Sequence, residues 1–139
     1  MKAYKTLKLT VGIATALATL TLTQGCALLL LGGVAAGAAY GTVKYVKNTL
    51  HATNEVSLDK AWSAANAALH EVEMPVTSST KDGASGKLVA KNAKSQPVII
   101  ELTRQTDKVT DIQITVGTFE SSENKIQAEQ IYNKMKARF

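Results

Sequence analysis

Alternating apolar and polar residues mark three neighbouring stretches in the second half of the chain. The alternation covers residues 87–91, 98–103 and 111–116. A period of two is typical of a β-strand with one buried face. Short polar connections at 92–96 and 107–108 separate the stretches. We therefore expect three consecutive strands in a meander, with one apolar face that other elements must cover.

Two segments on either side of this meander carry the spacing of amphipathic helices. Ser57 is a suitable N-cap, and apolar residues recur at helical spacing from Leu58 to Glu73, before Pro75 stops the helix. The second helix starts at Ser121 or the next serine, and its apolar stripe extends to Phe139. Its acidic residue comes early and its basic residues late, which matches the helix dipole.

A further strand is expected before the first helix. Residues 42–56 mix apolar and β-branched side chains with polar ones, and the pattern breaks near Lys47. Residues 77–80 are polar, and Asp82-Gly83 is a strong turn signal. The resulting order is β-α-β-β-β-α. We predict an α+β fold, a two-layer domain in which both helices cover one face of an antiparallel sheet and Trp62 packs between the layers.

The N-terminal region has the layout of a secretory signal. A basic start is followed by an apolar run from Leu9 to Leu22, and the small residue Gly25 precedes Cys26, the only cysteine. We expect residues 1–25 to be a signal peptide that is removed, which leaves Cys26 as the acylated first residue. The alternative is an uncleaved membrane anchor in which Cys26 is one apolar position of a long helix. A lone cysteine excludes an intramolecular disulfide.

Residues 26–41 form a second apolar segment, rich in glycine and alanine, next to the membrane. The segment is shorter than the ~20 residues that a membrane-spanning helix needs. Gly33, Gly37 and Gly41 are four residues apart, which would place them on one face of a helix. Two interpretations remain open. The segment is either a glycine-zipper helix that self-associates or a flexible connector made of small residues.

Length and charge narrow the class of protein. Removal of the signal leaves 114 of the 139 residues, which suits one domain, and we place this periplasmic domain at 42–139. The full chain has a net charge of +5, but three of its lysines lie in the signal. The rest of the chain has 13 basic and 11 acidic residues. Both signs are scattered along the chain, whereas nucleic-acid-binding proteins show a clustered basic patch. We expect no nucleic-acid partner.

The residues that could carry catalysis form no recognisable constellation. His51 and His70 are far apart along the chain and have no neighbouring cysteine, so no metal site is expected. Glu71 and Glu73 are two residues apart, which puts them on different faces of a helix. Gly86-Lys87 lacks the hydroxyl residue that completes a phosphate-binding loop. We therefore expect a protein that is not an enzyme and that holds no cofactor.

Five features follow one another in a fixed order along the chain. They are Gly25-Cys26, the Gly/Ala-rich segment, Ser57 to Trp62, the turn from Asp82 to Gly86 with Lys87 after it, and Val109 to Phe119. In this order the chain resembles a family of small Gram-negative envelope lipoproteins that is catalogued as a domain of unknown function. The resemblance implies an envelope lipoprotein and supplies no catalytic residues. In the last motif we expect Gly117 to relax the backbone and Phe119 to staple the start of the final helix.

The leading function is a non-enzymatic lipoprotein held by acyl chains at Cys26 on the periplasmic face of the outer membrane. Ala27, rather than an aspartate, follows the cysteine, which resembles the sorting signal for the outer membrane. The domain would contact another envelope protein or a small apolar ligand. One alternative is a membrane-associating oligomer assembled through Gly33, Gly37 and Gly41. Another is a carrier of a small hydrophobic ligand, which requires a cavity under the helices.

Overall fold

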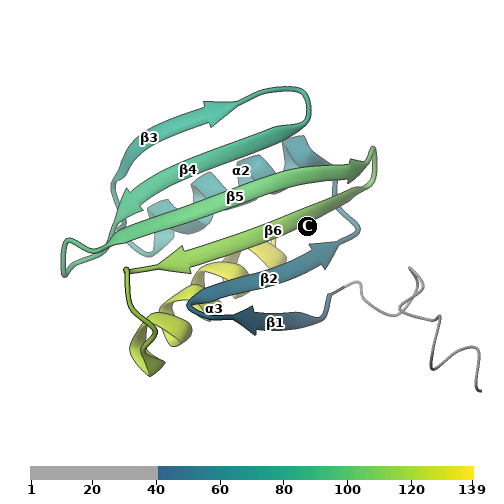
Figure 1. The fold of residues 1–139 in the computed structure, drawn as a ribbon. Coiled ribbons are helices and arrows are strands. Elements are labelled where there is room, and N and C mark those ends of the chain that lie inside the picture. Colours follow the sequence, from purple (N-terminus) through teal and green to yellow (C-terminus); the bar gives the residue numbers. More distant parts are fainter. Residues whose placement is uncertain (1–40) are drawn as a thin grey trace, which may run out of the picture. The chain divides into compact units, whose positions relative to one another are not determined.

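The computed structural model describes residues 41–139, which form a six-stranded sheet and two helices. The elements follow one another as β1 (Val43–Val46), β2 (Thr49–Asn54), α2 (Leu58–Glu71), β3 (Val76–Lys81), β4 (Ser85–Lys91), β5 (Pro97–Thr106), β6 (Val109–Val116) and α3 (Ser122–Lys136). Figure 1 shows both helices on the same face of the sheet. The predicted two-layer α+β architecture is confirmed.

The strands lie in the order β1-β2-β6-β5-β4-β3, and every neighbouring pair is antiparallel. The meander predicted for the second half of the chain forms β4, β5 and β6. The strand that precedes α2 then pairs with the strand that precedes α3, because β2 lies beside β6. Two segments far apart in the sequence therefore pair within the sheet.

The structure has six strands where the sequence pattern predicts four. The segment 42–56 is a hairpin rather than one interrupted strand, since Lys47 turns the chain at φ 57° and Val46 pairs with Thr49. The other additional strand is β3, at the edge of the sheet. All its residues are exposed, and a strand that is exposed on both faces shows no alternation of apolar and polar residues.

Apolar side chains between the sheet and the helices form one core. Alternate residues of the central strands meet one stripe from each helix. Leu69 on α2, Ile100 on β5 and Ile131 on α3 are all 0% exposed. The space under the helices, where a hydrophobic-ligand carrier would need its cavity, is occupied by such side chains in the described domain.

Trp62 lies half-buried against this core, over the start of β4. A Cβ atom added to Gly86 would come within 2.6 Å of Cε3 of the indole ring. The ring therefore lies directly on the backbone of β4, which glycine permits because it has no side chain. The predicted packing of Trp62 against the core is confirmed.

Both helices begin at the predicted serines. Ser57 and Ser121 each accept a hydrogen bond from the backbone N–H three residues further on, as N-caps do. The first helix ends at Glu71, two residues earlier than predicted. Glu73 leaves the helical conformation with a φ of 55°, just ahead of Pro75.

The junction between β6 and α3 confirms one prediction and corrects another. Gly117 has a φ of 70°, a conformation that glycine adopts without steric cost. Phe119 does not staple the helix, because it is 81% exposed. With Ser121 as the N-cap, the staple position belongs to Glu120, whose carboxylate pairs with Nζ of Lys125 at 2.6 Å. An ion pair takes the place of the predicted apolar contact.

Candidate functional site

The predicted lipid-attachment residue, Cys26, lies outside the residues that the structure describes, as do Gly33 and Gly37. Gly41 is described, and it has a φ of 79°. Its N–H donates to the carbonyl of Thr53 at 2.8 Å. A left-handed conformation does not continue an α-helix. Gly41 therefore lies in a turn at the start of the domain.

The side chains considered for chemistry are dispersed over the domain. Within residues 41–139 no three His, Cys, Asp or Glu side chains gather closely enough to hold a metal ion. His51 is half-buried on β2, whereas His70 is exposed on α2. Glu71 pairs with Arg138 and, at 3.1 Å, with Nζ of Lys134, so it links α2 to the C-terminal part of the chain. Neither helix of the described part combines the length and the apolarity that crossing a bilayer requires.

The sheet face away from the helices, here called the outer face, carries its side chains in rows. Strand register aligns one residue from each strand, which gives a polar row of Lys44, His51, Gln113, Glu101, Lys87 and Thr80. The neighbouring row consists of Val46, Thr49, Thr115, Ile99, Val89 and Ser78. Adjacent members of a row have Cβ atoms about 4.5–5.5 Å apart. The outer face is thus a broad surface of polar, hydroxyl and aliphatic side chains.

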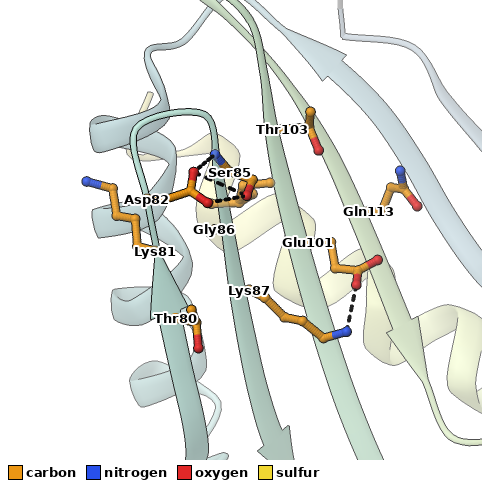
Figure 2. A pocket seen from close by; sticks show the side chains of 10 residues that line it. Thr80, Lys81, Asp82, Ser85, Gly86, Lys87, Glu101, Thr103 and Gln113 are labelled. Atoms are coloured by element: carbon orange, nitrogen blue, oxygen red, sulfur yellow. Dashed lines mark hydrogen bonds and ion pairs between the residues drawn. The ribbon is translucent and has the colours of Figure 1, made fainter.

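A depression of about 350 Å³ lies where the β3–β4 hairpin meets β5 and β6 (Figure 2). Most of the residues that line it have polar side chains, among them Thr80, Asp82, Ser85, Lys87, Glu101 and Gln113. Figure 2 shows Lys87 and Glu101 pointing toward each other, and Nζ lies 2.8 Å from Oε1. These two charges therefore neutralise each other within the depression.

Asp82 closes the hairpin at one end of the depression. Its Oδ1 accepts hydrogen bonds from the backbone N–H groups of Ala84 and Ser85, both at 2.7 Å. These two bonds hold the pKa of the Asp82 carboxyl below its ordinary value. The Ser85 hydroxyl donates to the same carboxylate, at 3.2 Å from Oδ2. A carboxylate with a lowered pKa is a weak base, so this pair stabilises a turn and is poorly suited to activating the hydroxyl.

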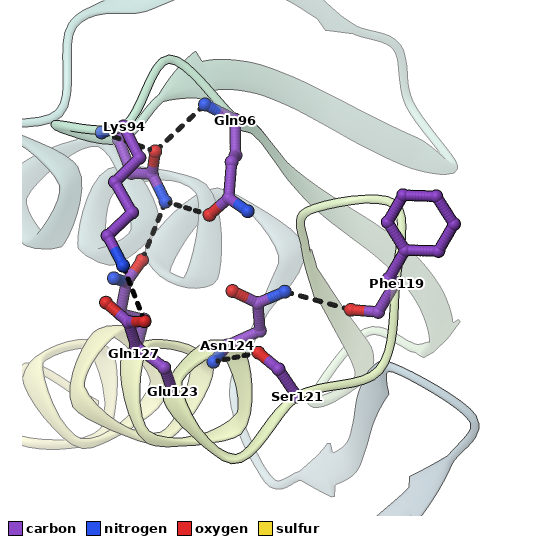
Figure 3. A network of polar contacts seen from close by, with 8 residues as sticks. Lys94, Gln96, Phe119, Ser121, Glu123, Asn124 and Gln127 are labelled. Carbon is purple, nitrogen blue, oxygen red and sulfur yellow. Dashed lines mark hydrogen bonds and ion pairs between the residues drawn. The ribbon is translucent and has the colours of Figure 1, made fainter.

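A second polar cluster joins the β4–β5 loop to α3 (Figure 3). Asn92 is 7% exposed. Its Nδ2 donates to the side-chain oxygens of Gln96 and Gln127, at 2.9 and 3.0 Å. Its Oδ1 accepts the backbone N–H groups of Lys94 and Gln96. The amide is therefore satisfied by the protein itself, and the cluster serves to fix the loop on the helix.

The loop 117–121 presents an exposed aromatic ring at the end of the sheet. Figure 3 shows the ring of Phe119 pointing away from the polar cluster, while the Phe119 carbonyl accepts a hydrogen bond from Nδ2 of Asn124 at 2.9 Å. The tip of the β1–β2 hairpin adjoins this loop. We call the loop and the hairpin-tip residues Lys47 and Asn48 the Phe119 end of the domain.

Sequence reasoning missed both the rows of the outer face and the Phe119 end. The rows depend on the register of strands that are distant in the sequence, and one of those strands has no periodic signal. The exposure of Phe119, however, could have been predicted from the sequence. If Ser121 is the N-cap, the residue that can staple the helix is Glu120, which leaves Phe119 without a partner in the helix.

The comparison with curated proteins gives no match. The comparison with protein families does give one, to a family described as "Protein of unknown function (DUF3568)" over residues 8–135. The matched stretch includes the N-terminal region that contains Cys26 together with nearly all of the α+β domain. The two parts of the chain are therefore features of a single family, and this protein belongs to the DUF3568 family of proteins of unknown function.

Proposed function

We propose that this protein is a non-enzymatic envelope lipoprotein, anchored by acyl chains at Cys26, whose α+β domain binds another envelope protein. The observation that carries the proposal is the position of the only cysteine. Cys26 directly follows a small residue, an apolar run and a basic start, which is the layout of a cleaved and acylated signal.

The anchoring chemistry supports a stable membrane location. A single acyl chain binds a membrane only marginally, whereas two signals give stable anchoring. The several acyl chains of a bacterial lipoprotein would meet that requirement at Cys26. Ala27 follows the cysteine, so the outer membrane is the favoured membrane, with the domain facing the periplasm.

The surface chemistry of the domain supports binding rather than catalysis. In the depression beside the β3–β4 hairpin, Lys87 is paired with Glu101, and Asp82 is bonded to backbone N–H groups. Catalysis requires a group that remains free to transfer a proton or attack a substrate. The outer face and the Phe119 end instead offer exposed side chains for contact with a macromolecule.

The intact mass of the protein extracted from membranes tests the anchoring. We expect a species that lacks residues 1–25 and carries the mass of acyl chains. The Cys26→Ala variant, expressed in the same way, should lack both changes. Because Cys26 precedes the domain, the fluorescence spectrum of Trp62, the only tryptophan, should be the same in both proteins, which controls for misfolding.

An unmodified, full-length mass for the wild-type protein would contradict the proposal. The uncleaved segment would then act as the membrane anchor, and the alternative interpretation of the N-terminal region would hold. A truncated mass without acyl chains would also contradict it, since the protein would then be secreted rather than anchored.

A further inference from the structure

The aromatic ring of Phe119 has no role in the described fold. The side chain is 81% exposed, and only the carbonyl group of the residue takes part in the loop. Any residue could supply that carbonyl. The backbone around it does have a fixed role, because Gly117 needs its positive φ. The ring is therefore the part of this junction that is available to another molecule.

Hydrogen bonds on both sides fix the backbone of the loop that carries the ring. The N–H of Gly117 donates to the carbonyl of Pro97 at 2.8 Å, and its carbonyl accepts Nδ2 of Asn48 at 3.1 Å. Asn124 and the capping residue Ser121 fix the other side of the loop. Because the backbone is already fixed, binding through the ring would not have to order the loop.

The Phe119 end carries one paired carboxylate and one unpaired lysine. Glu120 of the loop is paired with Nζ of Lys125 at 2.6 Å. Lys47, at the adjoining hairpin tip, is exposed and makes no ion pair within residues 41–139. A partner surface that complements Lys47 therefore carries an acidic group.

The Phe119 end lies away from the point where the domain begins. Gly41 is bonded to Thr53, beside the start of β6, whereas Gly117 follows the last residue of β6. Figure 1 shows the start of β1 and the end of β6 at opposite ends of the strands. The chain that leads to Cys26 is thus joined to one end of the domain, and the exposed ring stands at the other.

We propose that the Phe119 end is a docking surface for a second protein, in which the Phe119 ring enters an apolar pocket and Lys47 faces an acidic rim. Aromatic anchors surrounded by a polar rim are the usual form of energetically important contacts between proteins. The inference rests on the proposed function only for the compartment of the partner, since the contact itself does not require acylation.

A photo-reactive benzoyl-phenylalanine at position 119 of the full chain, expressed in cells, tests this surface. Val76 is the matched control position, because it is also apolar and exposed (41%) but lies on the edge strand β3. We expect a discrete adduct with one protein, identified by mass spectrometry, from position 119 and not from position 76. Lys47→Glu should lower the adduct yield, and replacing an acidic residue of the identified partner by lysine should restore it.

Affinity for the identified partner gives the second measurement. Phe119→Ala in the full chain should weaken binding at least about 30-fold, as expected for an anchor residue, while Val76→Ala should leave it unchanged. An adduct with lipid, an adduct with a second copy of the chain, no adduct at all, or insensitivity to Lys47→Glu would each overturn the docking surface.

The two proposals fail in distinguishable ways. A protein whose mass shows acyl chains but whose position 119 yields no adduct retains the anchor and loses the docking surface. A protein without acyl chains that still gives the charge-dependent adduct retains the docking surface and loses the anchor.

Discussion

Trp62 and Gly86 show how one absent side chain decides where another can lie. The indole ring covers the backbone of β4 at a distance that leaves no room for a Cβ atom. Gly83 in the neighbouring turn has no atom within 4 Å of the same position. The two glycines are three residues apart in the sequence, but only Gly86 is needed to make room for another side chain. The sequence pattern alone does not distinguish these two roles.

Gly86→Ala should therefore destabilise the domain, because the new methyl group displaces Trp62 from its place on β4. Overpacking of this kind costs about 1–3 kcal/mol. The free energy of unfolding, measured with urea and followed by the fluorescence of the only tryptophan, checks this. Gly83→Ala is the matched control and should change stability by less than about 0.5 kcal/mol. Equal effects of the two substitutions would contradict the close contact.

At the scale of helices and strands, the sequence predicts both helices and the three strands of the meander, whose side chains divide between core and solvent. Strands β4, β5 and β6 each have one buried face, so their alternation is visible in the sequence. The edge strand β3 is polar and exposed throughout, so it has no such signal. The β1–β2 turn uses Lys47 at positive φ, without the Asn-Gly or Asp-Gly pair that usually marks a tight hairpin.

The hairpin between β3 and β4 should respond to acid through Asp82. The N–H groups of Ala84, and then of Ser85, lower the pKa of this carboxyl in the folded state. A lowered pKa adds stability above the unfolded value of about 3.9. That stability is lost as the pH falls through the folded pKa. We expect the difference in urea midpoint between wild type and Asp82→Ala to be constant near neutral pH and to shrink below about pH 4.

Asp82→Asn separates the charge from the geometry of this turn. The asparagine oxygen can still accept the two backbone hydrogen bonds, but it does not titrate. Its stability relative to Asp82→Ala should therefore not change as the pH falls. If the difference in urea midpoint between wild type and Asp82→Ala stayed the same in strong acid, the carboxylate charge would make no contribution to the stability of the turn.

At the scale of the molecule, both helices and the central strands share one core. No layer of the described domain can bury its apolar face without the other. We expect a fragment of residues 42–139 to unfold in a single cooperative transition. The far-UV circular dichroism and the fluorescence of Trp62 should give the same urea midpoint. Two separate midpoints would mean that the layers are stable independently, which the shared core does not allow.

The outer face and the Phe119 end could be predicted from the sequence to a smaller extent than the fold. Burial leaves a periodic trace in the sequence, so the two-layer fold follows from the positions of apolar residues. The Phe119 end depends on which serine caps α3 and on a hairpin that folds back to bring Asn48 to Gly117. Such contacts join residues that are distant along the chain and have no repeating pattern.

The positions of Gly41 and Phe119 also determine how the domain would carry tension. A pull between these two points runs along the strands, since they lie at opposite ends of the sheet. Antiparallel hydrogen bonds lie perpendicular to the strands, so the bonds between β1 and β2 would be strained together in shear. A pull on β3 across the sheet would instead break its bonds one after another. A force applied between an anchor at Gly41 and a partner bound at Phe119 would thus act along the strands, the direction in which the sheet resists force better.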